Sequence, residues 1–183
     1  MGATGWAYFV PYQEDINKAL QELREQVFKE GQYQKPYEPT GAELTLAKSY
    51  LASLSPNPER TRKELDTLLA LSEALTGPRK AKPAPKTIKQ LLKQCGEDGT
   101  HSILDIERVS STPAFGAVTP LSRQQLLDIF GTEQPTQVMV ETWSARIDSL
   151  DAEPLYGRWE GIYLVVYKDP QPDEIYFEGC SGD

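Results

Sequence analysis

The stretch GIYLVVYKDPQPDEIYFEG, residues 161–179, decides the predicted fold class. Its two ends are short runs of β-branched and aromatic residues, which are typical of strands. Residues 168–173 between them contain two prolines and two aspartates, which favour a turn. The stretch therefore predicts a β-hairpin with a loop of about five residues.

Three further strands are predicted outside this hairpin. They are residues 6–12 (WAYFVPY), 99–110 (GTHSILDIERVS) and 136–147 (TQVMVETWSARI). The first is rich in aromatic residues and contains Pro11 near its end, which is typical of an edge strand or a strand terminus. The other two show apolar and polar residues in alternation, as expected of half-buried strands.

Helices are predicted from apolar residues at helical spacing and from signals at the helix ends. They cover residues 14–31, 42–54, 57–76, 87–96 and 119–131. Gly31 is expected to end the first helix in a left-handed conformation. Thr87 is expected to begin the fourth with a capping box. Thr119 is expected to cap the fifth, with Pro120 in its first turn and Gly131 at its end.

The order of these elements indicates an α+β domain. We expect a mostly antiparallel sheet of about five strands, with helices packed on one face and a β-rich C-terminal third. A chain of 183 residues is long enough to bury one core, so a single domain over residues 1–183 is predicted. The stretch around RKAKPAPK is rich in proline and lysine, which predicts an exposed connector at residues 78–86.

The chain is acidic, with a formal net charge of −8 and a pI near 4.8. Acidic proteins repel phosphates, which disfavours nucleic-acid binding over a broad face. The two cysteines, Cys95 and Cys180, form no CxxC pair, which fits reduced thiols in a cytoplasm. No signal peptide or membrane-spanning apolar run is visible, so we expect a soluble cytoplasmic protein without a membrane partner.

A candidate catalytic site lies in the predicted strand 99–110. His101, the single histidine, would share one face of this strand with Asp105 and Glu107, because alternate residues of a strand point the same way. The two carboxylates would lie about 7 Å apart, within reach of one Mg²⁺ or Mn²⁺ ion. His101 could then serve as a general base in a hydrolase or transferase. The alternative is a solvated strand face without chemistry.

Other catalytic signatures are missing from the sequence. Neither a nucleotide-binding glycine loop nor a GxSxG or HExxH motif is present. One histidine and two distant cysteines do not make a structural zinc site. A catalytic thiol at Cys180 would need His101 as its base, and the acidic residues beside it would raise its pKa.

A candidate binding surface lies in the segment DAEPLYGRWEG, residues 151–161. Tyr156, Arg158 and Trp159 in this segment have the composition of binding hot spots. We predict them as contacts to a partner protein, with Asp105 and Glu107 as charged contacts. The alternative is that helices cover the aromatic residues and that they form core.

Three stretches carry a resemblance. GWAYFVPYQEDINKALQELREQVFKEGQY, HSILDIERVS and EGIYLVVYKDPQPDEIYFEGCSGD are together similar to small stand-alone bacterial proteins of unassigned function. In size and charge the chain also resembles immunity and antitoxin proteins. That second likeness implies a protein that neutralises a toxin by binding it.

Three hypotheses follow. The leading one is a non-enzymatic cytoplasmic module, without a cofactor, that binds a more basic protein and is possibly of the immunity or antitoxin type. The second is an enzyme that uses His101, Asp105 and Glu107, with Mg²⁺ or Mn²⁺ as its cofactor. The third is binding of an anion by the basic residues of the stretch 79–86.

Overall fold

The computed structural model describes residues 4–34, 84–148 and 155–181. Contacts group residues 1–36 and 85–183 into one unit and residues 37–84 into another, and the description below concerns the first unit. The helices predicted at 42–54 and 57–76, and most of the predicted connector, lie outside the described residues. The single-domain boundary therefore stays a prediction.

The predicted hairpin is present as strands β4 (Glu160–Lys168) and β5 (Gln171–Ser181). Its turn is shorter than predicted, because the strands pair up to the point where only Asp169 and Pro170 connect them. Two-residue turns are the commonest hairpin connections, since their twist matches that of the strands. The polar, proline-containing connector thus belongs mostly to the strands.

The described residues form a five-stranded sheet, which confirms the α+β class and the total number of strands, although β3 was not among the strands predicted. The other strands are β1 (Thr4–Pro11), β2 (Arg108–Val109) and β3 (Ala117–Pro120), and the order is β1-β5-β4-β3-β2. The prediction of a mostly antiparallel sheet is wrong, because β4 pairs in parallel with β3, and β3 in parallel with β2. Two helices connect β3 to β4, and a helical crossover returns the chain in the same direction.

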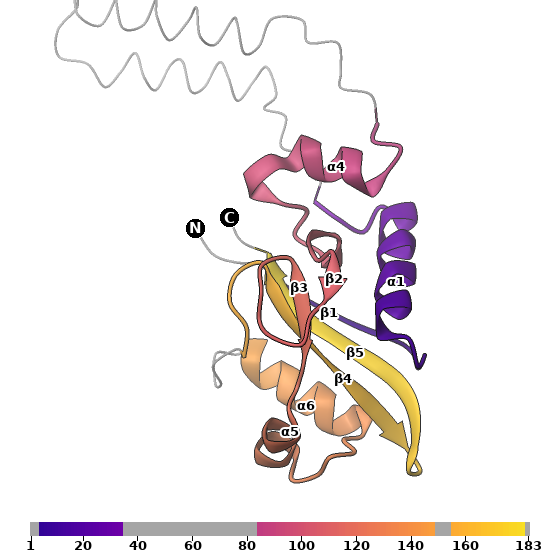
Figure 1. The fold of residues 1–183 in the computed structure, drawn as a ribbon, viewed down its shortest axis with the longest axis vertical. Helices are drawn as coiled ribbons and strands as arrows, with labels where there is room; N and C mark the ends of the chain where they lie inside the picture. Colours follow the sequence, from indigo (N-terminus) through magenta and orange to yellow (C-terminus); the bar gives the residue numbers. More distant parts are fainter. Residues whose placement is uncertain (1–3, 35–83, 149–154, 182–183) are drawn as a thin grey trace, which may run out of the picture. The chain divides into compact units, whose positions relative to one another are not determined.

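Helices cover both faces of the sheet, which corrects the prediction of a single covered face. In the described chain α1 (Ile16–Glu30) covers one face, and α5 (Arg123–Phe130) and α6 (Gln137–Asp148) cover the other (Figure 1). Helix α4 (Ile88–Cys95) packs onto the first core at the end of the sheet. β5 shows why both faces need a cover. Ile175 and Phe177 lie in the first core and Tyr176 in the second. A strand that is apolar on both sides must be buried on both sides.

Residues 136–147, predicted as a strand, form most of helix α6 instead. Its buried residues are Val140, Trp143 and Ile147, which follow the spacing of a helix and not that of a strand. The β-branched residues favoured the strand prediction. Packing of this stripe against the second core outweighs their modest local preference for a strand.

Residues 99–110 are not one strand either. His101 has a left-handed backbone with φ +54°, and Ser102 then caps a 3₁₀ helix over Ile103–Asp105 by accepting from the Leu104 amide. Pairing resumes only in the two-residue strand β2. The predicted face with His101, Asp105 and Glu107 in line therefore does not exist.

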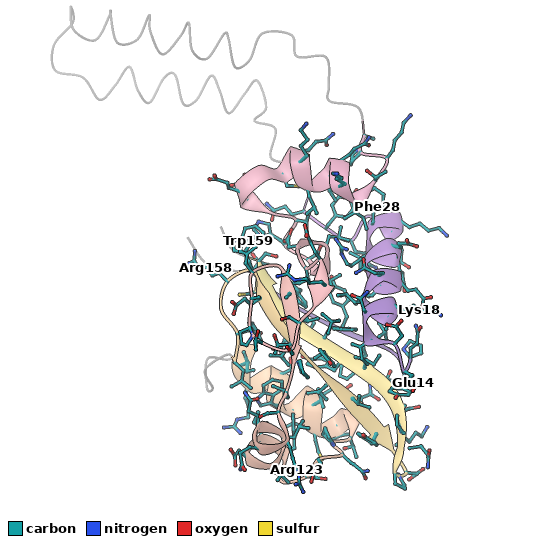
Figure 2. The ribbon with its side chains drawn as sticks, viewed as in Figure 1. Glu14, Lys18, Phe28, Arg123, Arg158 and Trp159 are labelled. Atoms are coloured by element: carbon teal, nitrogen blue, oxygen red, sulfur yellow. The ribbon has the colours of Figure 1, made fainter. Side chains whose placement is uncertain are left out.

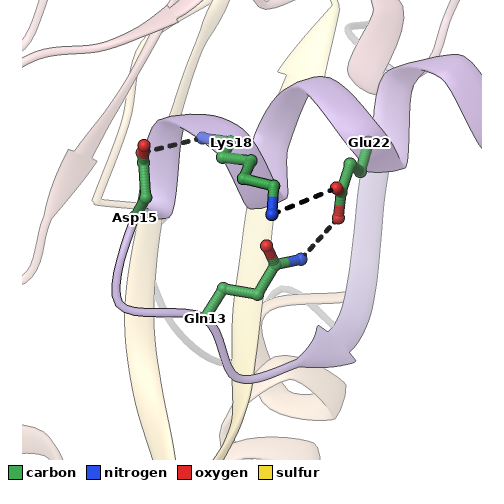
Figure 3. Close-up of polar contacts among 4 residues, drawn as sticks. All are labelled: Gln13, Asp15, Lys18 and Glu22. Atoms are coloured by element: carbon green, nitrogen blue, oxygen red, sulfur yellow. Dashed lines mark hydrogen bonds and ion pairs between the residues drawn. The ribbon is translucent and has the colours of Figure 1, made fainter.

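The start of α1 is fixed by side chains around its first turn (Figure 3). Asp15 is the N-cap and accepts a 2.9 Å hydrogen bond from the Lys18 amide. Glu22 accepts from Gln13 and lies 3.7 Å from the Lys18 amine. Gly31 ends the helix with φ +70°, as the sequence predicts. Such capping satisfies backbone groups that the helix leaves without partners.

The other helix ends match the predictions in part. Thr87 caps α4 by accepting from the Gln90 amide, and Gly131 ends α5 in a left-handed conformation. The cap predicted at Thr119 is wrong, because this residue belongs to β3. Ser122 begins α5 with a capping box to Gln125.

Trp6 of β1 is buried against a part of the sheet that has no side chains. Gly161 of β4 and Gly179 of β5 are paired neighbours, and a Cβ atom at Gly179 would overlap the Trp6 ring and approach the Glu160 carbonyl oxygen to 2.5 Å. The indole thus fills the space that two glycines leave open. Glycine is often placed in strands where another group approaches the backbone closely.

Replacing Gly179 by alanine should therefore destabilise the protein. We expect Gly179→Ala to lower the free energy of unfolding by about 2–3 kcal/mol, because the added methyl group must displace backbone or indole. Equilibrium urea unfolding measures this change. Gly5→Ala is the matched control, since a Cβ atom at Gly5 meets nothing within 4 Å. Equal stabilities of the two variants would contradict this account of Trp6 packing.

Candidate functional site

Trp159 lies directly before β4 in a strained backbone conformation. Its φ is +62°, a value that is rare for bulky residues and costs free energy. Its amide donates to the Cys180 carbonyl oxygen at 3.0 Å, and its own carbonyl oxygen accepts from the Gly116 amide at 2.7 Å. The neighbouring backbone therefore holds Trp159 in place.

The Trp159 ring lies over Gly99 and beside an exposed phenylalanine. Gly99 has φ +74°, and a Cβ atom there would overlap the ring, so only glycine fits at this position. The ring centroid of Phe115 lies 5.7 Å from that of Trp159, and Phe115 is 69% exposed. Arg158 is exposed next to them, and Figure 2 shows Arg158 and Trp159 at the same end of the sheet. We call Phe115, Arg158 and Trp159 the aromatic patch.

A buried carboxylate lies beneath this patch. Asp105 is 6% exposed and accepts hydrogen bonds from the Thr100 amide at 2.8 Å, the Thr100 hydroxyl at 2.9 Å and the Ser181 hydroxyl at 2.6 Å. Buried charges are tolerated where such partners replace water. Asp105 joins the 3₁₀ segment to the end of β5 and does not reach the surface as a charged contact.

His101 and Glu107 take part in other hydrogen bonds than those of Asp105. His101 is half-buried, and its Nδ1 atom is 2.7 Å from the Thr4 hydroxyl. Glu107 is exposed, its amide donates to the Gly116 carbonyl oxygen, and its carbonyl oxygen accepts from Gln21. Among the described residues no hydrogen bond joins His101 to Asp105 or Glu107. The three side chains predicted as an acid–base site are thus not brought together as one.

The described residues also contain no group of three or more His, Cys, Asp or Glu side chains placed to hold a metal ion. The Mg²⁺ or Mn²⁺ alternative required Asp105 and Glu107 on one strand face. Asp105 is instead saturated by hydroxyl and amide donors, which leave its oxygens little capacity for a cation.

Tyr156 belongs to a second buried network, around Glu178. Glu178 is 3% exposed and accepts from the hydroxyls of Tyr156 and Tyr176, each at 3.0 Å. The Tyr176 hydroxyl also lies 2.8 Å from the hydroxyl of Ser144 on α6. Burial, together with the nearby negative charge of Glu178, raises the pKa of Tyr156. The Tyr156 hydroxyl is thus a structural donor, and the role of this residue as a partner contact stays a prediction.

Cys180 is not activated as a nucleophile. Burial raises the pKa of its thiol, and the hydrogen bond from the Trp159 amide and the charge of Arg158 offset this in part. Its Sγ atom donates to the Gly157 carbonyl oxygen at 3.3 Å. A nucleophilic cysteine needs the opposite shift, toward the thiolate.

The sequence prediction missed three residues of this region: Gly99, Phe115 and Glu178. Phe115 and Gly99 come next to Trp159 only through the fold, so their positions in the sequence give no signal. Glu178 alternates with Tyr176 on one face of β5, which a period of two could have indicated. Arg158 is exposed and Trp159 is half-buried, and their role as partner contacts stays a prediction.

Comparison of the chain with protein-family models, curated proteins and solved structures finds no match. Within the described ranges, no helix combines the length and the apolar character needed to span a membrane.

The role of Asp105 can be tested by its removal. We expect Asp105→Ala to lower the free energy of unfolding by about 3 kcal/mol, because buried amide and hydroxyl donors lose their acceptor. Glu107→Ala, which removes an exposed carboxylate two residues away, should change it by less than about 0.5 kcal/mol. Urea unfolding of both variants measures the difference. An Asp105→Ala protein as stable as Glu107→Ala would show that the network contributes nothing.

The Tyr156–Glu178 contact predicts a loss of stability at alkaline pH. The pKa of Tyr156 is raised in the folded state, whereas a tyrosine of the unfolded chain titrates near pH 10. The stability that this tyrosine adds is therefore fully present below about pH 10 and is lost as the pH rises further. Tyr156→Phe should therefore make the loss between pH 10 and 11.5 shallower. It should also lower stability at pH 7 by about 1–2 kcal/mol, because Glu178 loses a donor.

The control for this experiment is Tyr12→Phe, at a side chain that is 37% exposed. The free energy of unfolding of Tyr12→Phe should fall with rising pH as that of the parent protein does. Thermal unfolding at stepped pH gives both curves. Parallel curves for the parent protein and Tyr156→Phe would disprove the link to Tyr156.

Proposed function

We propose that this chain is a non-enzymatic module that binds a more basic protein, with the aromatic patch at the centre of the contact. The observation that supports this most is the exposure of Phe115, whose ring lies tilted beside that of a Trp159 held by two backbone hydrogen bonds. Large aromatic side chains fixed at a surface bind with little loss of conformational entropy, and Arg158 adds a residue type enriched at hot spots.

The charges near the patch suit a basic partner. Glu97 and Asp98 are exposed directly before Gly99, over which the Trp159 ring lies. Glu107 is exposed beside Gly116, which follows Phe115 in the chain. Acidic groups around an aromatic centre would speed encounter with a basic surface. The finer assignments, a cytoplasmic protein of the immunity or antitoxin type, stay predictions.

The competing enzyme hypothesis finds less support. It required His101, Asp105 and Glu107 on one strand face, and the 3₁₀ helix at Ile103–Asp105 separates them. Anion binding by the stretch 79–86 lies almost wholly outside the described residues. The binding module is therefore the function that the described geometry supports best.

Capture from a native lysate tests the proposal. The tagged full-length chain should retain a basic protein that Phe115→Ser and Arg158→Glu each weaken at least tenfold in a titration with the purified partner. Neither substitution should alter the unfolding midpoint much, because both side chains are exposed. Binding should also weaken as salt rises from 50 to 300 mM, since the encounter is electrostatic.

Val138→Ser is the matched control, because Val138 is 70% exposed on α6 and lies outside the patch. This variant should bind the same protein as strongly as the parent does. A partner whose affinity is equal for the parent, Phe115→Ser and Arg158→Glu would place the contact elsewhere. Capture of no protein by the parent chain would count against a binding module.

A further inference from the structure

Within the part of the chain that the structure describes, one edge of the sheet is protected and the other is open. At one side, β2 is only two residues long, and Gln21 of α1 donates to the Glu107 carbonyl oxygen beside it. At the other side, β1 has eight residues, Thr4–Pro11, none of which is charged. Among the described elements, β1 pairs with β5 alone. Short strands, charges, prolines and covering elements normally protect an edge from pairing, and among the described residues β1 shows only the proline at its end, Pro11.

The register identifies the backbone groups of β1 that face outward. The Tyr12 amide donates to the Asp173 carbonyl oxygen at 2.9 Å, directly after the pairing of Pro11 with Glu174. In an antiparallel pair, hydrogen-bonded residues alternate with residues whose amide and carbonyl groups point away. The outward-facing residues of β1 are therefore Gly5, Ala7, Phe9 and Pro11. Pro11 has no amide hydrogen to offer, whereas the other three do.

A shallow depression of about 220 Å³ runs beside this edge. It is lined by Ala7 and Phe9 of β1, by Tyr176 of β5, and by Glu141, Ser144 and Ala145 of α6. The outward backbone groups of Ala7 and Phe9 therefore lie next to a hollow that can receive side chains. An added strand places every second side chain on the same face of the sheet, here the face that α6 covers.

Glu141 gives the lining of the depression a negative charge, and its charge interacts with that of Glu174 on β5. Glu174, which pairs with Pro11, has its pKa raised by burial and by the negative charges of Asp173 and Glu141. Its Oε2 atom is buried and has no hydrogen-bond partner among the described residues. A cationic side chain placed there would relieve the repulsion among three carboxylates and supply the missing donor.

We propose that the open edge of β1 binds an extended basic segment of a partner protein, which adds to the sheet as a sixth strand. Its backbone would pair with Ala7 and Phe9, and a lysine or arginine would lie over Glu141 and Glu174. A second copy of this chain suits the edge less well, because two chains of net charge −8 would bring identical acidic groups together. None of the residues of the aromatic patch takes part in this contact.

A synthetic peptide serves as the probe for this edge. It has eight residues, alternating lysine and valine, with blocked ends, and its affinity for the full-length chain is measured by fluorescence anisotropy. A peptide of the same sequence with every second amide methylated keeps the charge but cannot pair along one side. We expect the first peptide to bind at least tenfold more tightly than the methylated one and than a glutamate–valine peptide.

Variants of β1 test whether the edge itself is used. In Ala7→Pro the lost amide faces outward, so the hydrogen bonds to β5 remain, as at Pro11. This variant should weaken binding of the lysine peptide at least tenfold. Ala7→Lys keeps the amide but adds a repelling charge, and it should weaken binding too if Ala7→Pro does not fold. Ala7→Val, with its amide and charge unchanged, should bind like the parent.

Variants of the carboxylates test the charge. Glu141→Gln and Glu174→Gln should each weaken binding of the lysine peptide about threefold at low salt. Glu25→Gln, on α1 and thus over the opposite face of the sheet, removes the same charge far from the edge and should leave the affinity unchanged. Equal effects of all three substitutions would show that only the net charge attracts the peptide, and this would overturn the proposal.

The remaining outcomes also decide the proposal. No binding of the lysine peptide at 1 mM, or equal binding by the parent, Ala7→Pro and Ala7→Lys, would overturn it. A dimer in sedimentation that Ala7→Pro abolishes, with no peptide binding, would identify a second copy as the occupant and overturn the basic segment. Because none of these variants alters Phe115, Arg158 or Trp159, failure here leaves the proposed function standing, and the reverse also holds.

Discussion

The position of the aromatic patch depends on the hydrogen bonds that the buried carboxylate of Asp105 accepts. This carboxylate holds the Thr100 amide and hydroxyl and the Ser181 hydroxyl, and so fixes the backbone next to Gly99. The Thr100 carbonyl oxygen accepts in turn from Gln34, just beyond α1. Asp105 thus joins the 3₁₀ segment to Thr100 and to the end of β5, and Thr100 joins this network to the residues after α1. The Trp159 ring lies over Gly99, so the geometry of the exposed surface follows from a carboxylate that is almost entirely buried.

The sequence predicted elements well where the local signals and the packing agree. The hairpin, β1, α1 and the glycine that ends α5 were all predicted, because turn residues, strand composition and caps act over a few residues. Prediction failed at α6, where β-branched residues lie on a helical stripe that only the second core explains. It failed again at β3, where no strand was predicted, and at the parallel pairing and the cover on both faces, because the pairing of distant strands leaves no local pattern.

The candidate site was predicted less completely than the fold. Arg158 and Trp159 were identified from composition, and the structure places them near Phe115, which composition alone did not single out. Asp105 and Tyr156 were predicted as contacts, yet each serves a buried network. Whether a carboxylate faces solvent or hydroxyl donors depends on the chain segments packed around it. In this protein those segments are β5 and the residues around Thr100, which are remote in sequence.

The pairing of β1 with β5 also governs how the chain can fold while it is being made. Thr4 pairs with Ser181 and Pro11 with Glu174, so the first described strand cannot pair until the last one has been synthesised. Ribosomes add about 5–20 residues per second, which leaves β1 without its partner for roughly 10–30 s. Throughout that interval the nascent chain exposes an uncharged strand with Trp6, Tyr8 and Phe9. Such a segment is a natural ligand for chaperones that hold nascent chains, and its release must coincide with the synthesis of β5.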